Sequence, residues 1–247
     1  MSAIPAAISG ASFKPFWIAR STPSRDDSNL SRPDERGFLA RLDARSFGQC
    51  SVARGELLIR EGDRFESLYQ IRAGQFKTCH SDQSGHDQVT GFQMSDELLG
   101  LDGIASGRHC FRAVALEDSV VGRIHYAELS ARLSESADLQ REFHRTLSRE
   151  IVRDQAMMLL LGTMPAQGRV AAFLLDLTHK LRARGWSASS LLLRMSRDEM
   201  GSYLGQTLET VSRALSSLQS KGVMAINRRQ VHVLDAPNLD RIAHCGG

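Results

Sequence analysis

The spacing of apolar positions changes near the middle of the chain. Between about Gly37 and Arg132 the apolar residues form short or alternating runs, among them ELLIR, SLYQIR, QFKTCH and QVTGFQM, and glycines interrupt these runs. Runs of about four to eight residues between turn-forming residues are typical of β-strands. This part of the chain is therefore predicted to be an all-β unit with tight turns.

From Ser136 to Leu161 the chain contains neither Gly nor Pro, and apolar residues recur every three or four positions. This period predicts one long amphipathic helix. The apolar stripe needs a covering surface, either a second copy of the chain across a two-fold axis or the β unit of the same chain. We expect the seam of a homodimer, formed by Phe143, Leu147, Ile151, Asp154, Met158 and Leu161.

Asp154 is the charged position of this stripe. In a dimer the two Asp154 carboxylates would approach each other and weaken the association, unless Arg149 or Arg153 pairs with them.

A second helical pattern begins after the break at Gly162–Gly168 and ends at Gly185. The segment Leu191–Met195 is typical of a short strand. Ser196 comes next, and Glu199 follows three residues later. This is the capping-box pattern, in which each side chain satisfies an exposed amide of the first turn, so a new helix is expected to begin there.

A tight turn, another helix and a hairpin complete the pattern. The letters GQT predict the turn, Thr207 can cap the helix that follows, and Lys221-Gly222 ends it. Asn227 to Gln230 is predicted to form the hairpin tip. Helix, turn, helix and hairpin is the order of winged helix-turn-helix domains, whose second helix enters the major groove of DNA.

The second helix of this motif has two different faces. The apolar face is predicted to pack on the core and consists of Leu208, Val211, Leu215 and Leu218. The outward face carries Glu209, Ser212, Arg213 and Ser216.

This outward face suits base recognition. Arg213 has two parallel donors that match O6 and N7 of guanine, Glu209 can accept from a cytosine amino group and orient Arg213, and Ser212 can contact a base edge. The simpler alternative is that Glu209 and Arg213 form only an i,i+4 ion pair on a solvated surface. Phosphate contacts are expected from Ser196, Arg197, Thr207, Arg228 and Arg229.

Charge and composition narrow the class of protein. The 247-residue chain has a formal net charge of +3, but residues 163–247 hold 11 Lys and Arg against 6 Asp and Glu, which favours a polyanion as partner of this part. No apolar run approaches the roughly 20 residues that span a bilayer, and the N-terminus lacks the layout of a signal peptide. We therefore expect a cytoplasmic protein that binds no membrane. The chain has no Gly-rich phosphate loop, nucleophile elbow or paired-His metal motif, so we do not expect an enzyme.

The stretch MSRDEMGSYLGQTLETVSRALSSLQSKGVM closely resembles the recognition segment of Crp/Fnr-type bacterial regulators, including the Glu-x-x-Ser-Arg signature of the Fnr branch. GDRFESLYQIRAGQFKT, GHDQVTGFQMSDELLGLDGIASG and EIVRDQAMMLLLG are similar to other parts of that branch, so the resemblance covers about residues 36–240. One departure is Leu208, where a smaller Val is usual, and this change would alter a contact with a thymine methyl group.

The resemblance implies an α+β chain. Its parts would be a flexible N-terminal tail (1–35), a β-roll like that of cyclic-nucleotide-binding domains (36–135), a dimerisation helix (136–162) and a C-terminal winged helix-turn-helix DNA-binding domain (163–247).

The resemblance also implies the function. The chain would be a sequence-specific transcription regulator, mainly an activator, that binds double-stranded DNA as a homodimer. Glu209, Ser212 and Arg213 would read the half-sites of a TTGAT-N4-ATCAA-like palindrome. RNA polymerase would contact the β-roll at Gly85, His86 and Asp87.

The positions that carry the input signal depart from the family pattern. Oxygen-sensing members of the Fnr branch hold a [4Fe–4S] cluster on four thiolates, but residues 1–49 contain no cysteine and Gly122 stands at the β-roll ligand position. Members that bind cyclic AMP have a Gly-Glu and an Arg-Ser pair around the phosphate. Here Leu99-Gly100-Leu101-Asp102 replaces the first pair, and Arg-Ser is absent from SGRHC. We therefore expect no iron–sulfur cluster, no cyclic AMP and no other cofactor.

Other inputs stay open at this point. Abundance alone could control activity, or the chain could be a sensing module that binds DNA only weakly. The four cysteines are Cys50, Cys79, Cys110 and Cys245, and they form no Cys-x-x-Cys pair. The candidate sensor groups are the thiols Cys79 and Cys110, the haem or metal ligands His80, His109 and His125, and the anion-binding residues Arg108 and Arg112.

Overall fold

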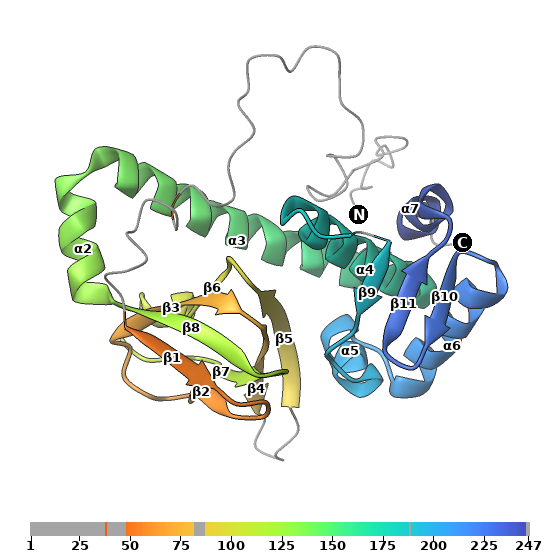
Figure 1. Cartoon of the computed structure of the whole chain (residues 1–247), viewed down its shortest axis with the longest axis horizontal. Helices are drawn as coiled ribbons and strands as arrows, with labels where there is room; N and C mark the ends of the chain where they lie inside the picture. Colours follow the sequence, from red (N-terminus) through yellow and green to blue (C-terminus); the bar gives the residue numbers. More distant parts are fainter. Residues whose placement is uncertain (1–37, 39–47, 82–86, 188, 246–247) are drawn as a thin grey trace, which may run out of the picture.

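The computed structural model describes residue 38 and residues 48–81, 87–187 and 189–245. A β unit, a long helix α3 and a mixed unit of helices and strands follow each other, and α3 runs past the β unit toward the mixed unit (Figure 1). The predicted tail and the polymerase-contact residues Gly85 and His86 lie outside the described residues, whereas Asp87 lies within them. None of the described helices is both long and apolar enough to span a bilayer.

Two four-stranded antiparallel sheets form the β unit, in the orders β1-β8-β3-β6 and β2-β7-β4-β5. Ile71, Phe76 and Val121 are fully buried in one cluster that joins the two sheets, which confirms the predicted β-rich unit. The strands are β1 Gln49–Val52, β2 Leu57–Ile59, β3 Ser67–Ala73, β4 Gln75–Ser81, β5 Asp87–Met94, β6 Leu98–Leu99, β7 Arg112–Ala115 and β8 Ser119–His125, and the short 3-10 helix η3 Leu101–Gly103 follows β6.

The β pattern ends at His125, so the prediction of an all-β unit as far as Arg132 was wrong. Tyr126–Glu135 forms helix α2. This segment contains no Gly or Pro. Leu129, its buried residue, packs in the same cluster as Leu68 and Ile124 of the β-roll.

The predicted long helix is present as α3, Ala137–Thr163. Ser136 caps it, because its hydroxyl accepts a hydrogen bond from the backbone N–H of Leu139 at 3.3 Å.

The faces of α3 divide the predicted dimer stripe. Phe143 is buried with its ring centroid 5.2 Å from that of Phe38, and Leu147 packs against the same β-roll cluster. Leu161 packs against the core of the C-terminal unit. Phe143 is therefore buried within its own chain, which corrects the prediction for this residue, whereas Leu147 and Leu161 are only partly buried and their place in a dimer seam stays a prediction. Ile151 and Met158 are 57% and 71% exposed and lie two turns apart.

The mixed C-terminal unit contains the predicted helices and hairpin. Its elements are α4 Ala166–Ala183, β9 Ser190–Leu192, α5 Arg197–Leu204, α6 Leu208–Ser220, β10 Met224–Asn227, β11 Gln230–Val233 and α7 Ala236–Cys245. Strand β9 pairs with the hairpin in the order β10-β11-β9. The pattern in the sequence did not indicate α7.

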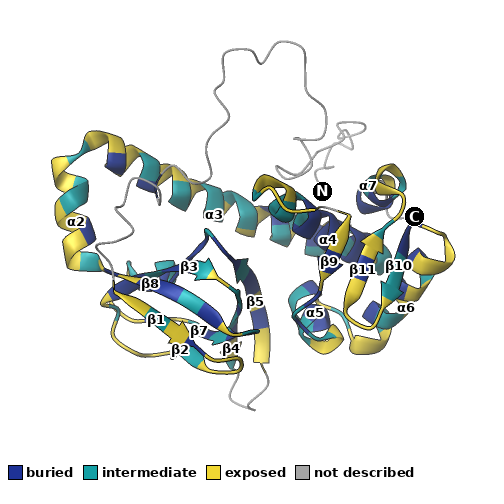
Figure 2. Cartoon of the chain, in the orientation of Figure 1, coloured by how far each residue is buried: buried dark blue, intermediate teal, exposed yellow. Residues whose placement is uncertain are grey.

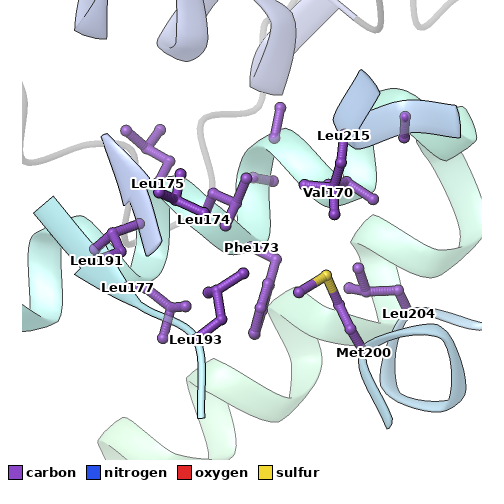
Figure 3. Close-up of a cluster of buried hydrophobic side chains, with 14 of the residues drawn as sticks. Val170, Phe173, Leu174, Leu175, Leu177, Leu191, Leu193, Met200, Leu204 and Leu215 are labelled. Carbon is purple, nitrogen blue, oxygen red and sulfur yellow. The ribbon is translucent and has the colours of Figure 1, made fainter. Parts of the chain in front are cut away.

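Helix α4 forms the centre of this unit. Val170, Phe173 and Leu174 of α4 lie among side chains from β9, α5 and α6 (Figure 3). The middle of α4 is dark blue in Figure 2, while α6 carries a yellow outer face. The same buried cluster includes Val89 and Phe92 of β5, so the β-roll contributes to the core of the C-terminal unit.

Candidate nucleic-acid interface

The helix-turn-helix is built by the local signals that the sequence carries. The capping box of α5 is complete: Ser196 Oγ accepts the N–H of Glu199 at 3.0 Å, and Glu199 Oε2 accepts the N–H of Ser196 at 2.7 Å. Gly205 ends α5 at φ +61°, a left-handed conformation that costs glycine little. Thr207 then caps α6, because its hydroxyl accepts the N–H of Thr210.

The turn between the two helices is too close for a larger residue at position 201. A Cβ on Gly201 would lie 2.6 Å from the carbonyl oxygen of Gln206. Arg169 of α4 donates to the carbonyl of Leu204 at 3.0 Å and holds the end of α5. Helices α5 and α6 therefore form one closely packed pair with a fixed crossing.

Three of the four apolar residues of α6 pack as predicted. Val211, Leu215 and Leu218 are buried. Leu208 is 44% exposed, so its assignment to the core face was wrong. It occupies the first position of α6, ahead of the buried contacts, and its side chain is available to a ligand.

The outward face of α6 carries two opposite charges that do not pair. Arg213 Nη2 lies 3.4 Å from Thr210 Oγ1, and within the described residues it makes no ion pair with Glu209. The pKa of Glu209 is lowered by its own backbone N–H, by the Thr207 hydroxyl and by the charge of Arg213. Glu209 is therefore an ionised acceptor, and the guanidinium of Arg213 makes one long hydrogen bond to Thr210 rather than an ion pair with Glu209, which disfavours the simple ion-pair alternative.

Ser212 and Arg197 meet between the two helices. The guanidinium of Arg197 on α5 donates to Ser212 Oγ on α6 at 3.2 Å. Ser212 is half-buried, and Arg197 is exposed. The structure thus joins one predicted base-reading residue to one predicted phosphate-binding residue.

The hairpin tip presents two arginines. Asn227 pairs with Gln230, which leaves Arg228 and Arg229 as a two-residue loop. Both are exposed, and Arg229 donates to the carbonyl of Arg194 at 3.2 Å. Arg228 adopts φ +54°, a left-handed backbone conformation that is unfavourable for most residues other than glycine and asparagine.

Two family descriptions match the chain. Residues 168–242 match the Crp-like helix-turn-helix domain, and residues 49–136 match the cyclic nucleotide-binding domain. The chain is 42% identical over 191 residues to the transcriptional regulatory protein btr of Bordetella pertussis, covering 77% of this chain and 79% of that protein. The chain belongs to the Crp/Fnr family.

Other members of the family agree with this assignment. The transcriptional activator protein Anr of Pseudomonas protegens is 42% identical over 192 residues, which are 78% of this chain and 79% of Anr. The solved structure of FixK2 from Bradyrhizobium japonicum superposes with a TM-score of 0.72 and 29% identity, over 79% of this chain and 96% of FixK2. The chain is a Crp/Fnr-type DNA-binding transcription regulator.

In this Crp/Fnr member the donors of the β-roll that could hold an anionic effector already have partners. Asp102 Oδ2 accepts the backbone N–H groups of Cys110 at 2.6 Å and Phe111 at 3.2 Å. Arg108 donates to the carbonyl of Gly62, and Arg112 contacts both Cys79 and Asp87. The anion site that the sequence left open at Arg108 and Arg112 stays a prediction.

Gly122, which the sequence places at the β-roll ligand position of the Fnr branch, faces the side chain of Arg72. A Cβ at position 122 would lie 2.8 Å from Nε of Arg72, the far end of a flexible side chain. In the described parts of the chain no group of three or more His, Cys, Asp and Glu side chains could hold a metal ion.

The candidate thiols and imidazoles differ in exposure and in the groups that they contact. Cys110 is exposed, whereas Cys79 is fully buried and accepts a hydrogen bond from Arg112 Nε at 3.1 Å. Burial raises the pKa of Cys50, and the nearby Arg123 opposes this shift. His80 contacts Glu61, His109 is buried 3.5 Å from Asp102, and His125 lies 3.3 Å from the Ser67 hydroxyl. The side chain of Cys245 is outside the described residues.

Reasoning from the sequence missed the contact between the β-roll and the helix-turn-helix. Strands β4 and β5 of the β-roll contact α5 of the helix-turn-helix, for example through Lys77 Nζ and Glu199 Oε1 at 2.7 Å. The two residues are 122 positions apart, and no local pattern marks either of them as an interdomain contact.

Proposed function

We propose that the chain binds a TTGAT-N4-ATCAA-like palindrome as a homodimer and acts mainly as an activator. The observation that carries this proposal concerns two oppositely charged residues on the second helix of the motif. Glu209 and Arg213 are exposed one turn apart and form no ion pair with each other. An exposed guanidinium fork suits guanine, and an ionised carboxylate suits a cytosine amino group. Exposed Leu208 adds an apolar contact for a thymine methyl group.

The phosphate contacts would come from around this reading face. Ser196 and Thr207 lie at the N-termini of α5 and α6, where free backbone N–H groups attract anions. Arg197, Arg228 and Arg229 are exposed cations on α5 and the hairpin. Together they would position α6 without adding sequence preference.

The dimer seam would be the part of α3 that the chain itself leaves uncovered. Ile151 and Met158 are exposed apolar residues on this face. Asp154 lies between them, and Arg153 pairs with Glu97 and Glu150 instead of Asp154. Burial raises the pKa of Asp154, and Arg153 only partly opposes this shift. A second copy of the helix would bring two such carboxylates together, so the dimer should be adjustable rather than permanent.

The dimer would work without an iron–sulfur cluster. The cysteine-free residues 1–49 and the glycine at position 122 support this part of the proposal. RNA polymerase would be the second partner, through Gly85, His86 and Asp87.

The test is binding of the purified full chain to a labelled TTGAT-N4-ATCAA duplex by fluorescence anisotropy, in air and with reductant. Arg213→Ala should weaken binding by ~1–3 kcal/mol per half-site and relax the preference at the guanine position. Gln219→Ala, an exposed position near the end of the same helix, is the matched control. Equal weakening on all duplexes would mean that Arg213 contacts only phosphate, and binding that requires a reconstituted cluster would refute the cluster-free part.

A further inference from the structure

Helix α5 of the DNA-binding domain closes an open edge of the β-roll. Strand β5 is the last strand of its sheet, so its outer backbone groups have no partner strand. Ser202 of α5 takes that place: its hydroxyl accepts the N–H of Val89 at 2.8 Å and donates to the carbonyl of Asp87 at 3.0 Å. Gln88 reaches across and donates to the carbonyl of Ser202.

An ion pair completes this contact beside Ser202. Lys77 of β4 donates to Glu199 at 2.7 Å, and the side chains are 16% and 22% exposed. Such a pair is shielded from solvent more than an ordinary surface pair. We call the set of Lys77, Gln88, Val89, Glu199 and Ser202 the α5 clamp.

Packing of aromatic rings from β5, α4 and α5 adds to the contacts of the α5 clamp. Phe92 of β5 lies with its ring centroid 5.2 Å from that of Tyr203 on α5 and 5.7 Å from that of Phe173 on α4. Phe173 and Tyr203 also contact each other at 5.7 Å. A triangle of rings from three elements resists sliding, because any shift of α5 along β5 separates two of the three pairs.

The clamp connects directly to the reading face. Glu199 contacts Lys77 through one oxygen and closes the capping box with Ser196 through the other. Arg197, which directly follows Ser196 in the chain, donates to Ser212 on α6. Because the tight turn at Gly201 and Gly205 fixes α6 to α5, the clamp sets the position of α6 relative to the β-roll and α3.

We propose that the α5 clamp positions the two recognition helices of the dimer and thereby sets which half-site spacing the protein accepts. This inference rests on the proposed function, since spacing has meaning only for a dimer on a palindrome. One added base pair increases the distance between the half-sites by about 3.4 Å and rotates one half-site relative to the other by about 35° around the DNA axis. A recognition helix held by the clamp cannot follow this change, whereas a released one can. Lys77, Gln88 and Ser202 are positioning residues here, because they act on α6 only through their contacts between the β-roll and α5.

The test compares duplexes with three, four and five base pairs between the half-sites. The variant Lys77→Met/Ser202→Ala removes an ion pair and two hydrogen bonds, and it should lose about tenfold of the wild-type preference for the four-base-pair spacer, mainly by binding the other spacers better. Ser202→Thr keeps the hydroxyl and should retain the preference. Thr90→Ala is the matched control, because Thr90 is exposed on β5 and its hydroxyl bonds only Thr78 within the β-roll.

The outcomes separate the two proposals. A double variant that keeps the wild-type spacing preference refutes the clamp and leaves the proposed function intact. A wild-type chain that binds none of the palindromes refutes the proposed function and the clamp with it. Hydrogen exchange gives a readout without DNA: the amide of Val89 should be protected in wild type and in Ser202→Thr, and exchange faster in Ser202→Ala. Equal exchange in all three also overturns the clamp.

Discussion

Replacing Glu97 with Gln should destabilise the folded chain by about 3 kcal/mol at neutral pH. The side chain of Glu97 is 8% exposed, and Oε1 lies 3.2 Å from Lys180 Nζ, 3.4 Å from Arg184 Nη2 and 3.6 Å from Arg153 Nη2. Its second oxygen accepts the N–H of Met94 at 3.0 Å. The carboxylate thus joins the β5–β6 turn to α3 and α4.

The magnitude follows from the pKa of this carboxyl group. Burial alone would raise the pKa of Glu97, but the three cations and the Met94 N–H lower it from 4.5 to about 2. Each pKa unit corresponds to about 1.4 kcal/mol, which gives about 3 kcal/mol in total. Because the folded pKa is depressed, this stability is fully present above pH 4.5 and is lost as the pH falls toward 2.

Urea unfolding of wild type and Glu97→Gln at pH 7 and at pH 3 measures this contribution. The difference in unfolding free energy should shrink at the lower pH. Glu117→Gln is the control, because Glu117 also pairs with a cation of the C-terminal unit, Arg194 at 2.8 Å, but the side chains are 25% and 39% exposed. Such a pair contributes at most about 1 kcal/mol. A loss in Glu97→Gln that is independent of pH, or no larger than that of Glu117→Gln, would refute the reasoning.

Two further predictions concern the dimer seam and the hairpin. Asp154→Ala should tighten the dimer in sedimentation equilibrium, and Asp138→Ala, exposed at the start of α3, should not; an unchanged or weaker dimer would place Asp154 outside the seam. Arg228→Gly should stabilise the fold by about 1 kcal/mol in thermal unfolding, because glycine adopts φ +54° without strain, while DNA binding weakens equally on all sequences. Unchanged DNA binding would remove Arg228 from the phosphate contacts, and unchanged or lower stability would mean that its backbone is not strained.

Local signals in the sequence predicted most of the helix-turn-helix. The capping box at Ser196 and Glu199, the glycine after the last turn of α6 and the hairpin tip depend on residues a few positions apart. Leu208 was misplaced for a physical reason. Apolar period alone gives it the same face as Val211, but α6 reaches the core only one turn later.

Contacts between distant segments could not be predicted in this way. The spacing of Phe143 fits a dimer seam and an intrachain contact equally well, and only the path of α3 past Phe38 decides between them. The clamp pairs Lys77 with a residue 122 positions later, and Glu97 collects cations from two helices. None of these residues stands out from an ordinary solvated surface in the sequence.

Phe92 and Val89 of the β-roll share a buried cluster with α4, α5 and α6, and this has a consequence for folding. The β-roll also has buried clusters of its own, but part of it is built into the core of the C-terminal unit, so the two family-defined halves should melt in a single cooperative transition rather than in two. A fragment cut between them would expose apolar surface on both pieces. Folding of the β-roll and folding of the DNA-binding unit therefore depend on each other. A destabilising mutation in either part should lower the abundance of the whole regulator.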